Sequence, residues 1–373
     1  LGRGGGGRRE PFHTVRRTGD GDHMIAATYT QNAGYKIQDV PIPVIGDDEL
    51  LVRVMASSIC GTDLRIIQSG QRKLRDGQMV VLGHEFAGVV AQAGPKAADL
   101  FPIGMRVGVA PNIGCSRCSM CAKGLFNMCP DYSAFGINMD GAHAEYVRIP
   151  HASIQQGSVL PLPPDMPFVH AALIEPLSCV VNGNRSVSIQ PGETVLIFGA
   201  GPIGLMHAML ARHSGAGTVA VIDTQPDRLD QAARVGIEHL IDPGQCDVAE
   251  TVMRLTEGRG ADVIITACSV PAVQEQSLGL LAPFGRVCFF GGLPKDRPCI
   301  RVDANLIHYK NLVVTGVTGG APCHFRTALG LILDGSVDVS SVVSHTFDMN
   351  DMASAFEKAL HGQAMKVVIQ RQP

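Results

Sequence analysis

The fold follows from one stretch of the sequence, Thr194-Val195-Leu196-Ile197-Phe198-Gly199-Ala200-Gly201-Pro202-Ile203-Gly204. Its apolar first half does not alternate with polar residues, which predicts a strand buried on both faces of a parallel sheet. The G-x-G-x-x-G loop then opens a helix-like segment, with Pro202 and Ile203 in its first turn. Gly199 allows a tight turn, Gly201 lets the backbone approach a pyrophosphate, and Gly204 lets the helix pack on the strand. The stretch therefore predicts a dinucleotide-binding site in an α/β protein, with phosphate at the helix start.

A carboxylate in the right place narrows the choice of dinucleotide. Asp223 ends the next apolar run, nineteen residues after Gly204. A carboxylate there accepts hydrogen bonds from the adenosine ribose and repels a 2′-phosphate, which predicts NAD rather than NADP. Arg228 lies five residues further on and is expected to reach the ribose or the adenine face. The alternative is that the glycines make only a turn, Asp223 only caps a helix, and Arg228 is a solvated helix residue.

Composition excludes several classes of protein. The 373 residues carry a net charge of −3, with 45% hydrophobic and 17% charged residues, which is incompatible with disorder over most of the chain. There is no basic surplus to indicate nucleic-acid binding, and no apolar run long enough for a membrane-spanning helix. The eleven cysteines are an odd number without a secretory leader, which indicates a reducing, cytoplasmic location rather than a disulfide framework.

The texture of the sequence changes along the chain and predicts four segments. Residues 1–23 are rich in arginine and glycine and are expected to be a disordered leader. Residues 24–179 contain short runs with period two between glycines and prolines, which predicts a partly open barrel. Residues 180–317 contain continuous apolar runs separated by helical stretches, which predicts a parallel sheet. Residues 318–373 are expected to form two amphipathic helices and a last strand.

Four cysteines lie close together in the β-rich part: Cys115, Cys118, Cys121 and Cys129. Such short spacings allow one loop to wrap a zinc ion with four sulfur ligands, a closed site that leaves no position open for chemistry. We therefore predict a structural zinc site. Four reduced thiols without metal are one alternative. A zinc ribbon that reads nucleic acid is another, but the loop has few basic residues and a dinucleotide-binding fold follows it.

A second group of metal-ligating residue types is spread more widely. Cys60 and Thr62 follow a predicted strand, His84 and Glu85 lie just over twenty residues later, and Glu175 closes the β-rich part. Cysteine, histidine and glutamate are the ligands of open catalytic zinc sites. The spacing alone is only suggestive, because a single cysteine and histidine are more often an ordinary core thiol and a hydrogen-bonded imidazole.

Taken together, these motifs resemble the zinc-containing medium-chain dehydrogenases over nearly all of residues 24–373. The resemblance rests on C-G-T-D at 60–63, G-H-E-x-x-G-x5-G at 83–94, the four-cysteine lobe, E-P at 175–176 and the glycine loop. It implies a GroES-like catalytic domain joined to a Rossmann domain, with the tail returning to the catalytic domain. It also implies that Cys60, His84 and Glu85 hold a catalytic zinc, with Glu175 as fourth ligand or as hydrogen-bond partner of its water.

The branch that the chain resembles most contains the polyol and threonine dehydrogenases, since Glu175 stands where liver and yeast alcohol dehydrogenases have cysteine. The implied reaction is oxidation of a secondary alcohol, such as a polyol, a sugar alcohol or its phosphate, by NAD. Zinc lowers the pKa of the substrate hydroxyl, and Thr62 passes the proton toward solvent. The alternatives are a threonine-type dehydrogenase and a non-catalytic NAD-binding relative. The expected partners are a small-molecule alcohol and further copies of the chain in a homodimer or homotetramer.

The sequence departs from its relatives at two places. Many of them carry histidine three residues after the relay hydroxyl, where this chain has Arg65. Arg65 either changes the proton path, pairs with an anionic substrate or lies on a helix surface. Animal sorbitol dehydrogenases also have an Arg-Tyr pair near residues 318–320, where this chain has Thr-Gly-Gly, which argues against sorbitol as substrate. His324 and Arg326 are expected to face the pocket instead, and Cys179 to be a core thiol.

Overall fold

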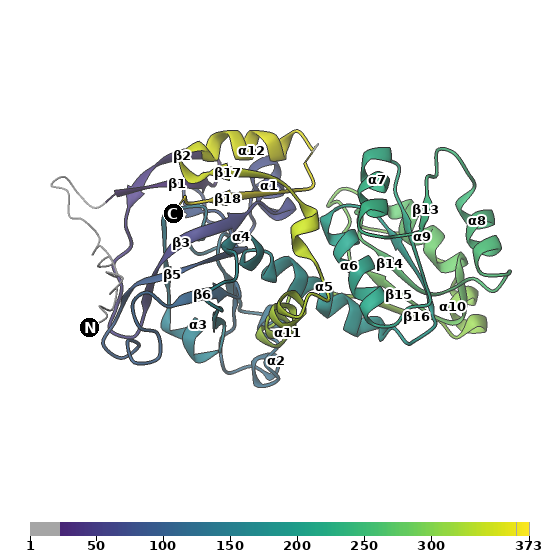
Figure 1. Cartoon of the computed structure of the whole chain (residues 1–373), viewed down its shortest axis with the longest axis horizontal. Helices are drawn as coiled ribbons and strands as arrows, with labels where there is room; N and C mark the ends of the chain where they lie inside the picture. Colours follow the sequence, from purple (N-terminus) through teal and green to yellow (C-terminus); the bar gives the residue numbers. More distant parts are fainter. Residues whose placement is uncertain (1–22, 363, 373) are drawn as a thin grey trace, which may run out of the picture.

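The computed structural model describes residues 23–362 and 364–372 as two lobes joined by helices (Figure 1). The predicted leader therefore lies outside the described residues, except for His23, which begins the first strand. The α/β class is confirmed: a β-rich lobe precedes a parallel sheet flanked by helices. No helix among the described residues is long and apolar enough to span a membrane.

The first lobe is built from short strands that wrap around a buried apolar core. Its strands are β1 (His23–Thr30), β2 (Gly34–Pro41), β3 (Leu50–Ser58), β4 (Met79–Val81), β5 (Phe86–Ala93), β6 (Arg106–Val109), β7 (Asn112–Ile113), β8 (Ser133–Ala134), β9 (Tyr146–Ile149) and β10 (Val159–Pro161). Its helices are α1 (Gly61–Ser69), α2 (Ser119–Ala122), η1 (Phe126–Met128), α3 (His151–Gln155) and α4 (Phe168–Ala171). The central strand β3 pairs with β5, β9 and β18, so three distant segments meet on it.

The C-terminal segment returns to this lobe. It contains α11 (Pro322–Leu333), η2 (Val339–Val342), β17 (Val343–Asp348), η3 (Met349–Asp351), α12 (Met352–Leu360) and β18 (Lys366–Gln370). Strand β18 pairs antiparallel with β3, and Ile369 lies opposite Ser57. Ile369 and Val367 are buried in the barrel core with Phe356 of α12, which explains why the last strand is apolar.

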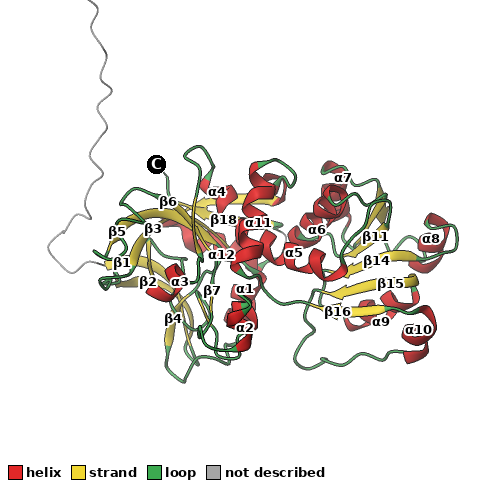
Figure 2. Ribbon diagram, turned by 90° about the horizontal axis from the view of Figure 1, so that it is seen from below, coloured by secondary structure: helices red, strands yellow, loops and turns green. Residues whose placement is uncertain are grey.

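The second lobe is a six-stranded parallel sheet with helices around it (Figure 2). Its strands are β11 (Thr194–Phe198), β12 (Thr218–Ile222), β13 (His239–Ile241), β14 (Ala261–Thr266), β15 (Leu281–Phe289) and β16 (Val313–Gly316). Its helices are α6 (Pro202–His213), α7 (Pro226–Arg234), α8 (Val248–Leu255), α9 (Pro271–Gly279) and α10 (Ala304–Lys310). The strand order β13-β12-β11-β14-β15-β16 reverses direction between β11 and β14. Ligands of such sheets bind at this switch point, which is where the glycine loop begins.

Helix α5 (Ile174–Val187) connects the two lobes. Its first turn carries Glu175, and Leu177, Val180 and Val181 pack in one core with α6 and the sheet. Helix α11 packs beside α5, and its Phe325 joins the same core (Figure 2). The change of sequence texture that we place between residues 179 and 180 thus falls inside a helix, because α5 contributes side chains to both lobes.

One histidine in α6 is buried without polar contacts. His207 is completely buried, and neither ring nitrogen has a hydrogen-bond partner. Its ring packs edge-on against Phe290, with centroids 4.7 Å apart. Burial lowers the pKa of His207 to about 3, so the folded protein holds it neutral.

This histidine makes the fold sensitive to acid. Below pH 6.5 the unfolded chain binds a proton at His207 that the folded protein takes up only near pH 3, so acid favours unfolding. Protonation of His207 in the unfolded chain should lower the free energy of unfolding by about 2 kcal/mol between pH 8 and pH 5. We expect His207→Leu to lose correspondingly less stability over this range, measured as urea midpoints at both pH values. Equal losses in the two proteins would contradict the assignment.

Candidate active site

The glycine loop has the geometry that its sequence predicts. Gly199 has φ +104°, in the left-handed region that favours glycine, and a Cβ at Gly204 would lie 1.7 Å from the carbonyl oxygen of Gly199. A Cβ at Gly201 would meet nothing within 4 Å, which leaves room beside the loop. Helix α6 begins directly after it, with Pro202 in the first turn, so the free N–H groups of the helix start face this space.

Asp223 lies against this loop, as its position after β12 predicts. One carboxylate oxygen accepts a hydrogen bond from the N–H of Ala200 (2.7 Å), and the other accepts from the N–H of Gln225 (2.9 Å). The guanidinium of Arg228 lies 3.9 Å from the same carboxylate. The structure thus brings the two predicted side chains together at the end of the loop, with Asp223 buried and Arg228 partly exposed.

The second predicted group also converges. Cys60 lies between β3 and α1, and His84 and Glu85 lie between β4 and β5. One ligand atom from each of the three lies within 4.8 Å of the others. His84 and Glu85 are buried, so a metal held by them would be shielded from bulk water on the protein side. Strands β3 and β5 are neighbours in the sheet, which explains how residues more than twenty positions apart meet.

Asp63, the last residue of the C-G-T-D motif, supports this group and has no role predicted from sequence. It is completely buried, and its carboxylate accepts the backbone N–H of Cys60 (2.9 Å) and lies 3.5 Å from Nδ1 of His84. Burial alone would raise the pKa of Asp63, but the charges and hydrogen bonds of His84 and His143 hold it well below its usual range. The local signal was available, since Asp63 is the N3 residue of the helix that Cys60 caps.

Lys366 is a second residue that sequence reasoning missed. Its ammonium lies 2.5 Å from the Glu85 carboxylate and donates to the carbonyl of Ile59 (3.1 Å). The hydroxyl of Ser58 also donates to Glu85. No local signal could identify Lys366, because it comes from β18, near the other end of the chain.

Glu175 lies near the cluster but outside the group of ligand atoms that meet within 4.8 Å. Burial raises its pKa to about 7, with opposing contributions from His84 and Glu85. The thiol of Cys179 donates to its carboxylate (3.4 Å), and burial raises the pKa of that thiol well above its usual value. Cys179, which we expected to be a core thiol, is therefore in contact with a site residue.

The donor set fits a divalent cation. Burial lowers the pKa of His84, but Cys60 and Asp63 raise it well above its usual value, so this position favours positive charge. A soft sulfur, an imidazole and a carboxylate are the ligands that zinc accepts in catalytic sites. Because Asp63 faces Nδ1 of His84, the nitrogen left for a metal is Nε2.

The two departures from the family pattern have definite contacts. Arg65 donates to the hydroxyl oxygen of Thr62 (3.2 Å) from the exposed side of α1. His324 accepts the N–H of Ala321 and so caps α11, and Arg326 donates to the carbonyl of Gly157 (3.3 Å). His324 and Arg326 thus each bond to backbone, and their position at the substrate pocket stays a prediction.

Three asparagines hold the segment that lacks the Arg-Tyr pair. Asn127, Asn182 and Asn112 donate to the carbonyls of residues 318, 319 and 320, at 2.8, 2.8 and 3.1 Å. They come from η1, α5 and β7. This segment leads from β16 to α11. Three side-chain hydrogen bonds therefore fix the connection between the parallel sheet and the other lobe.

The four cysteines of the loop also meet within 4.8 Å. The N–H of Cys115 donates to the sulfur of Cys129 (3.3 Å), and that of Cys121 donates to Cys118 (3.4 Å). Backbone N–H groups, that of Arg117 first, lower the pKa of Cys115 to about 6, which favours the thiolate that zinc requires. The geometry therefore fits a closed four-sulfur site.

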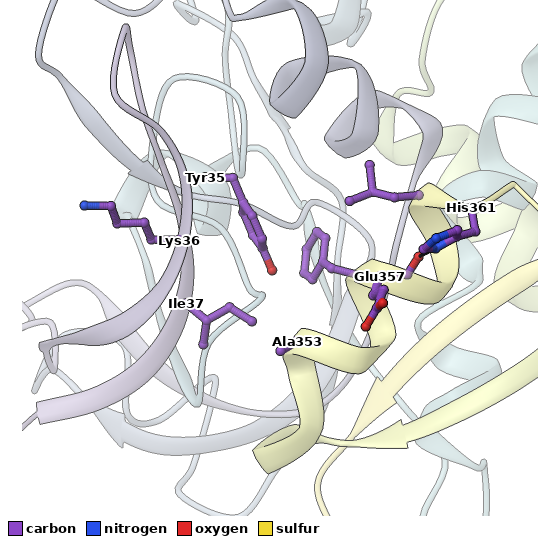
Figure 3. A pocket seen from close by; sticks show the side chains of 8 residues that line it. Tyr35, Lys36, Ile37, Ala353, Glu357 and His361 are labelled. Atoms are coloured by element: carbon purple, nitrogen blue, oxygen red, sulfur yellow. Dashed lines mark hydrogen bonds between the residues drawn. The ribbon is translucent and has the colours of Figure 1, made fainter.

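A hollow of about 390 Å³ lies elsewhere, between β2 and α12 (Figure 3). Tyr35 and Ile37 line it from the strand, and Ala353, Glu357 and His361 from the helix side. None of the predicted site residues lines it, and its walls are mostly apolar. It is therefore separate from the cluster around Cys60.

Comparisons with known proteins agree with this geometry. The alcohol dehydrogenase GroES-like domain matches residues 46–164, and the zinc-binding dehydrogenase domain matches residues 202–334. Sorbitol dehydrogenase of Bacillus subtilis is 32% identical over 365 residues, covering 96% of this chain and 98% of its own. The chain belongs to the zinc-binding alcohol dehydrogenase family.

Further members of the family are equally similar. L-threonine 3-dehydrogenase of Pyrococcus furiosus is 33% identical over 354 residues, covering 93% of this chain and 98% of its own. A solved structure from Sinorhizobium meliloti, bound to NADP, has a TM-score of 0.85 at 31% identity, and the match covers 93% and 99% of the two chains. The predictions of a polyol/threonine-like branch and of a zinc- and nicotinamide-dependent dehydrogenase are confirmed at this level.

The four-sulfur site predicts how one cysteine change behaves. We expect Cys118→Ser to lose about one zinc per chain and to melt at a much lower temperature, because a closed zinc site contributes folding energy. Metal analysis and thermal melting measure both effects. Cys299→Ser is the matched control, since Cys299 is exposed and lies in neither group. Wild-type zinc content and melting temperature in Cys118→Ser would contradict a metal at these sulfurs.

Proposed function

We propose that this chain oxidises a secondary alcohol of the polyol, sugar-alcohol or sugar-alcohol phosphate class, with NAD as the hydride acceptor. The observation that carries the proposal is the meeting of the half-buried Cys60 with the buried His84 and Glu85, in a chain whose glycine loop is bonded to Asp223. The relatives named above act on sorbitol or threonine, which supports the class of substrate but not one compound.

The proposed roles follow from the contacts. Cys60, His84 and Glu85 would hold a catalytic zinc, with Glu175 as a further ligand or as a hydrogen-bond partner of its water. When bound, zinc supplies a Lewis acid that lowers the pKa of the substrate hydroxyl, and the nicotinamide accepts hydride. Cys115, Cys118, Cys121 and Cys129 hold a structural zinc.

Thr62 takes the hydroxyl proton of the substrate. Its oxygen already accepts a hydrogen bond from Arg65, whose guanidinium stays protonated and cannot accept a proton in turn. The proton therefore leaves Thr62 for solvent and does not pass to residue 65. The same guanidinium is a suitable partner for an anionic substrate, which favours sugar-alcohol phosphates over neutral polyols as the first compounds to test.

A substrate panel with two proteins tests the proposal. Neutral polyols, sugar-alcohol phosphates, threonine and simple alcohols are offered with NAD, and reduction of the cofactor is followed by its absorbance. We expect turnover with a polyol or its phosphate and about two zincs per chain. Cys60→Ser should abolish turnover and keep cofactor affinity, because Cys60 lies outside the glycine loop.

The alternatives give different outcomes on the same panel. Threonine as the best substrate would support the amino-alcohol branch. No turnover of any compound, together with one zinc per chain, would support a non-catalytic NAD-binding relative. Loss of cofactor binding together with turnover in Cys60→Ser would show that the site has been misplaced.

We propose NAD rather than NADP because the Asp223 carboxylate lies at the end of the glycine loop, beside the N–H of Ala200. A 2′-phosphate there would meet a negative charge in a buried place. Asp223→Asn removes the charge but keeps an oxygen that can accept the N–H. We expect this variant to raise the NADP-to-NAD ratio of kcat/KM about tenfold or more, that is by about 1.4 kcal/mol. An unchanged ratio would contradict the role of the charge.

We also propose that the chain forms homodimers or homotetramers. Strand β16 lies at the edge of the parallel sheet and pairs only with β15 among the described strands. Its Val313 and Val314 are 49% and 39% exposed, and an open apolar edge is a ready site for pairing with a second copy. Light scattering should give a mass of two or four chains of 39.5 kDa.

We propose a cytoplasmic location because the cysteines are not in disulfides. None of the eleven, all of which lie in the described part of the chain, forms a disulfide. Free thiols at zinc-site spacing are maintained in reducing compartments.

A further inference from the structure

We propose that His143 is a positioning residue of the catalytic metal centre, acting through Asp63 on the metal ligands Cys60 and His84. The inference rests on the proposed assignment of Cys60 and His84 as ligands. His143 belongs to none of the motifs that the sequence analysis singled out, and it lies in the segment between β8 and β9.

The contacts of the His143 ring define which nitrogen carries its proton. Nε2 lies 3.3 Å from the carboxylate of Asp63, and Nδ1 lies 2.9 Å from the hydroxyl oxygen of Ser57. An ionised carboxylate can only accept a hydrogen bond, so Nε2 carries a hydrogen and donates it. In the neutral ring, Nδ1 is then the acceptor, and the Ser57 hydroxyl donates to it. All three side chains are completely buried, so water does not compete for these bonds.

Asp63 connects His143 to the proposed metal ligands. Its carboxylate accepts hydrogen bonds from the backbone N–H of Cys60 and from Nε2 of His143, and its other oxygen lies 3.5 Å from Nδ1 of His84 as an ion-pair contact. The same carboxylate therefore contacts both proposed ligands, Cys60 and His84, as well as His143. Without His143, a fully buried carboxylate loses one donor and is free to turn away from His84. The His84 ring would then lose the partner that presents its Nε2 to the metal.

Packing keeps the His143 ring in place. Gly83, the residue before His84, has φ +98°, and a Cβ there would lie 2.5 Å from the backbone nitrogen of His143 and 2.7 Å from its ring. Phe356 of α12 packs edge-on against the ring, with centroids 5.2 Å apart and an interplanar angle of 87°. Gly83 therefore leaves space for the His143 ring next to the segment that carries His84 and Glu85.

The chain offers a matched control for a purely structural role. His207 is also completely buried and also packs edge-on against a phenylalanine, Phe290. Neither of its ring nitrogens has a partner, and it lies in α6 of the other lobe. Replacing either histidine removes a buried imidazole, but only His143 is linked to a metal ligand.

The experiment follows the release of zinc from the purified zinc-loaded protein to an excess of a coloured chelator, at pH 7.5 and without substrate. The phase that is absent in Cys60→Ser belongs to the catalytic site, and the remaining phase belongs to the four-sulfur site, which serves as an internal reference. We expect His143→Met to release the catalytic zinc about tenfold faster or more, since residues that orient ligands typically contribute 10- to 100-fold to metal affinity. The four-sulfur phase should keep its wild-type rate.

Three further variants separate positioning from structure. His143→Gln keeps an N–H donor near the position of Nε2 and should restore most of the wild-type rate. Ser57→Ala removes the partner of Nδ1 with little change in volume and should accelerate release in the same direction by a smaller factor. These two variants decide the question if His143→Met does not fold. His207→Met should leave both phases unchanged.

Unchanged catalytic release in His143→Met, or equal acceleration of both phases, would overturn the positioning role. No effect of Ser57→Ala together with no rescue by His143→Gln would do the same. A wild-type zinc content in Cys60→Ser would overturn the ligand assignment and the inference with it. The zinc-release assay uses no substrate, so its result does not depend on whether any compound of the substrate panel is turned over.

Discussion

The antiparallel pairing of β18 with β3 is the contact on which the rest of the site depends. It places Ile369 opposite Ser57, and it brings Lys366 to Glu85, although the two residues are far apart in the sequence. A buried carboxylate is stable only when it is paired and hydrogen-bonded. The last strand therefore completes the barrel and neutralises part of the charge that the metal site concentrates.

Charge balance explains the composition of the site. Asp63, Glu85 and Glu175 are all buried within reach of Cys60 or His84, and Lys366 is the one buried ammonium in contact with them among the described residues. The opposite directions of the pKa shifts of Asp63 and Glu175 follow from this arrangement. Burial raises the pKa of both carboxyl groups, but the nearby His84 and His143 outweigh it at Asp63, whereas at Glu175 burial prevails and the neighbouring Glu85 carboxylate adds to it. Such a surplus of negative groups suits the binding of a divalent cation in electrostatic terms.

Two of the segments that connect the lobes also carry or contact residues of the proposed metal sites. Helix α5 carries Glu175 in its first turn and packs on the sheet with its later turns. The segment of residues 318–320 is held by asparagines from α5, from β7 and from the 3-10 turn beside the four-cysteine lobe. A structural zinc in that lobe would thus steady the turn that carries Asn127. The closed metal site is in this way linked to the crossing between the lobes.

The sequence alone determined the parallel sheet, the glycine loop, the carboxylate at Asp223 and both groups of metal-ligating residue types. These features depend on short spacings and on local periodicity, which are visible without a fold. Only the tertiary structure decided that Asp63 contacts both His84 and His143, that Lys366 meets Glu85, and that His143 packs against Gly83. It also decided that His324 and Arg326 hold backbone. Each of these contacts joins segments whose meeting depends on strand pairing and helix packing. The cap made by His324 is the exception, because it accepts the N–H of Ala321 only three residues earlier in the chain.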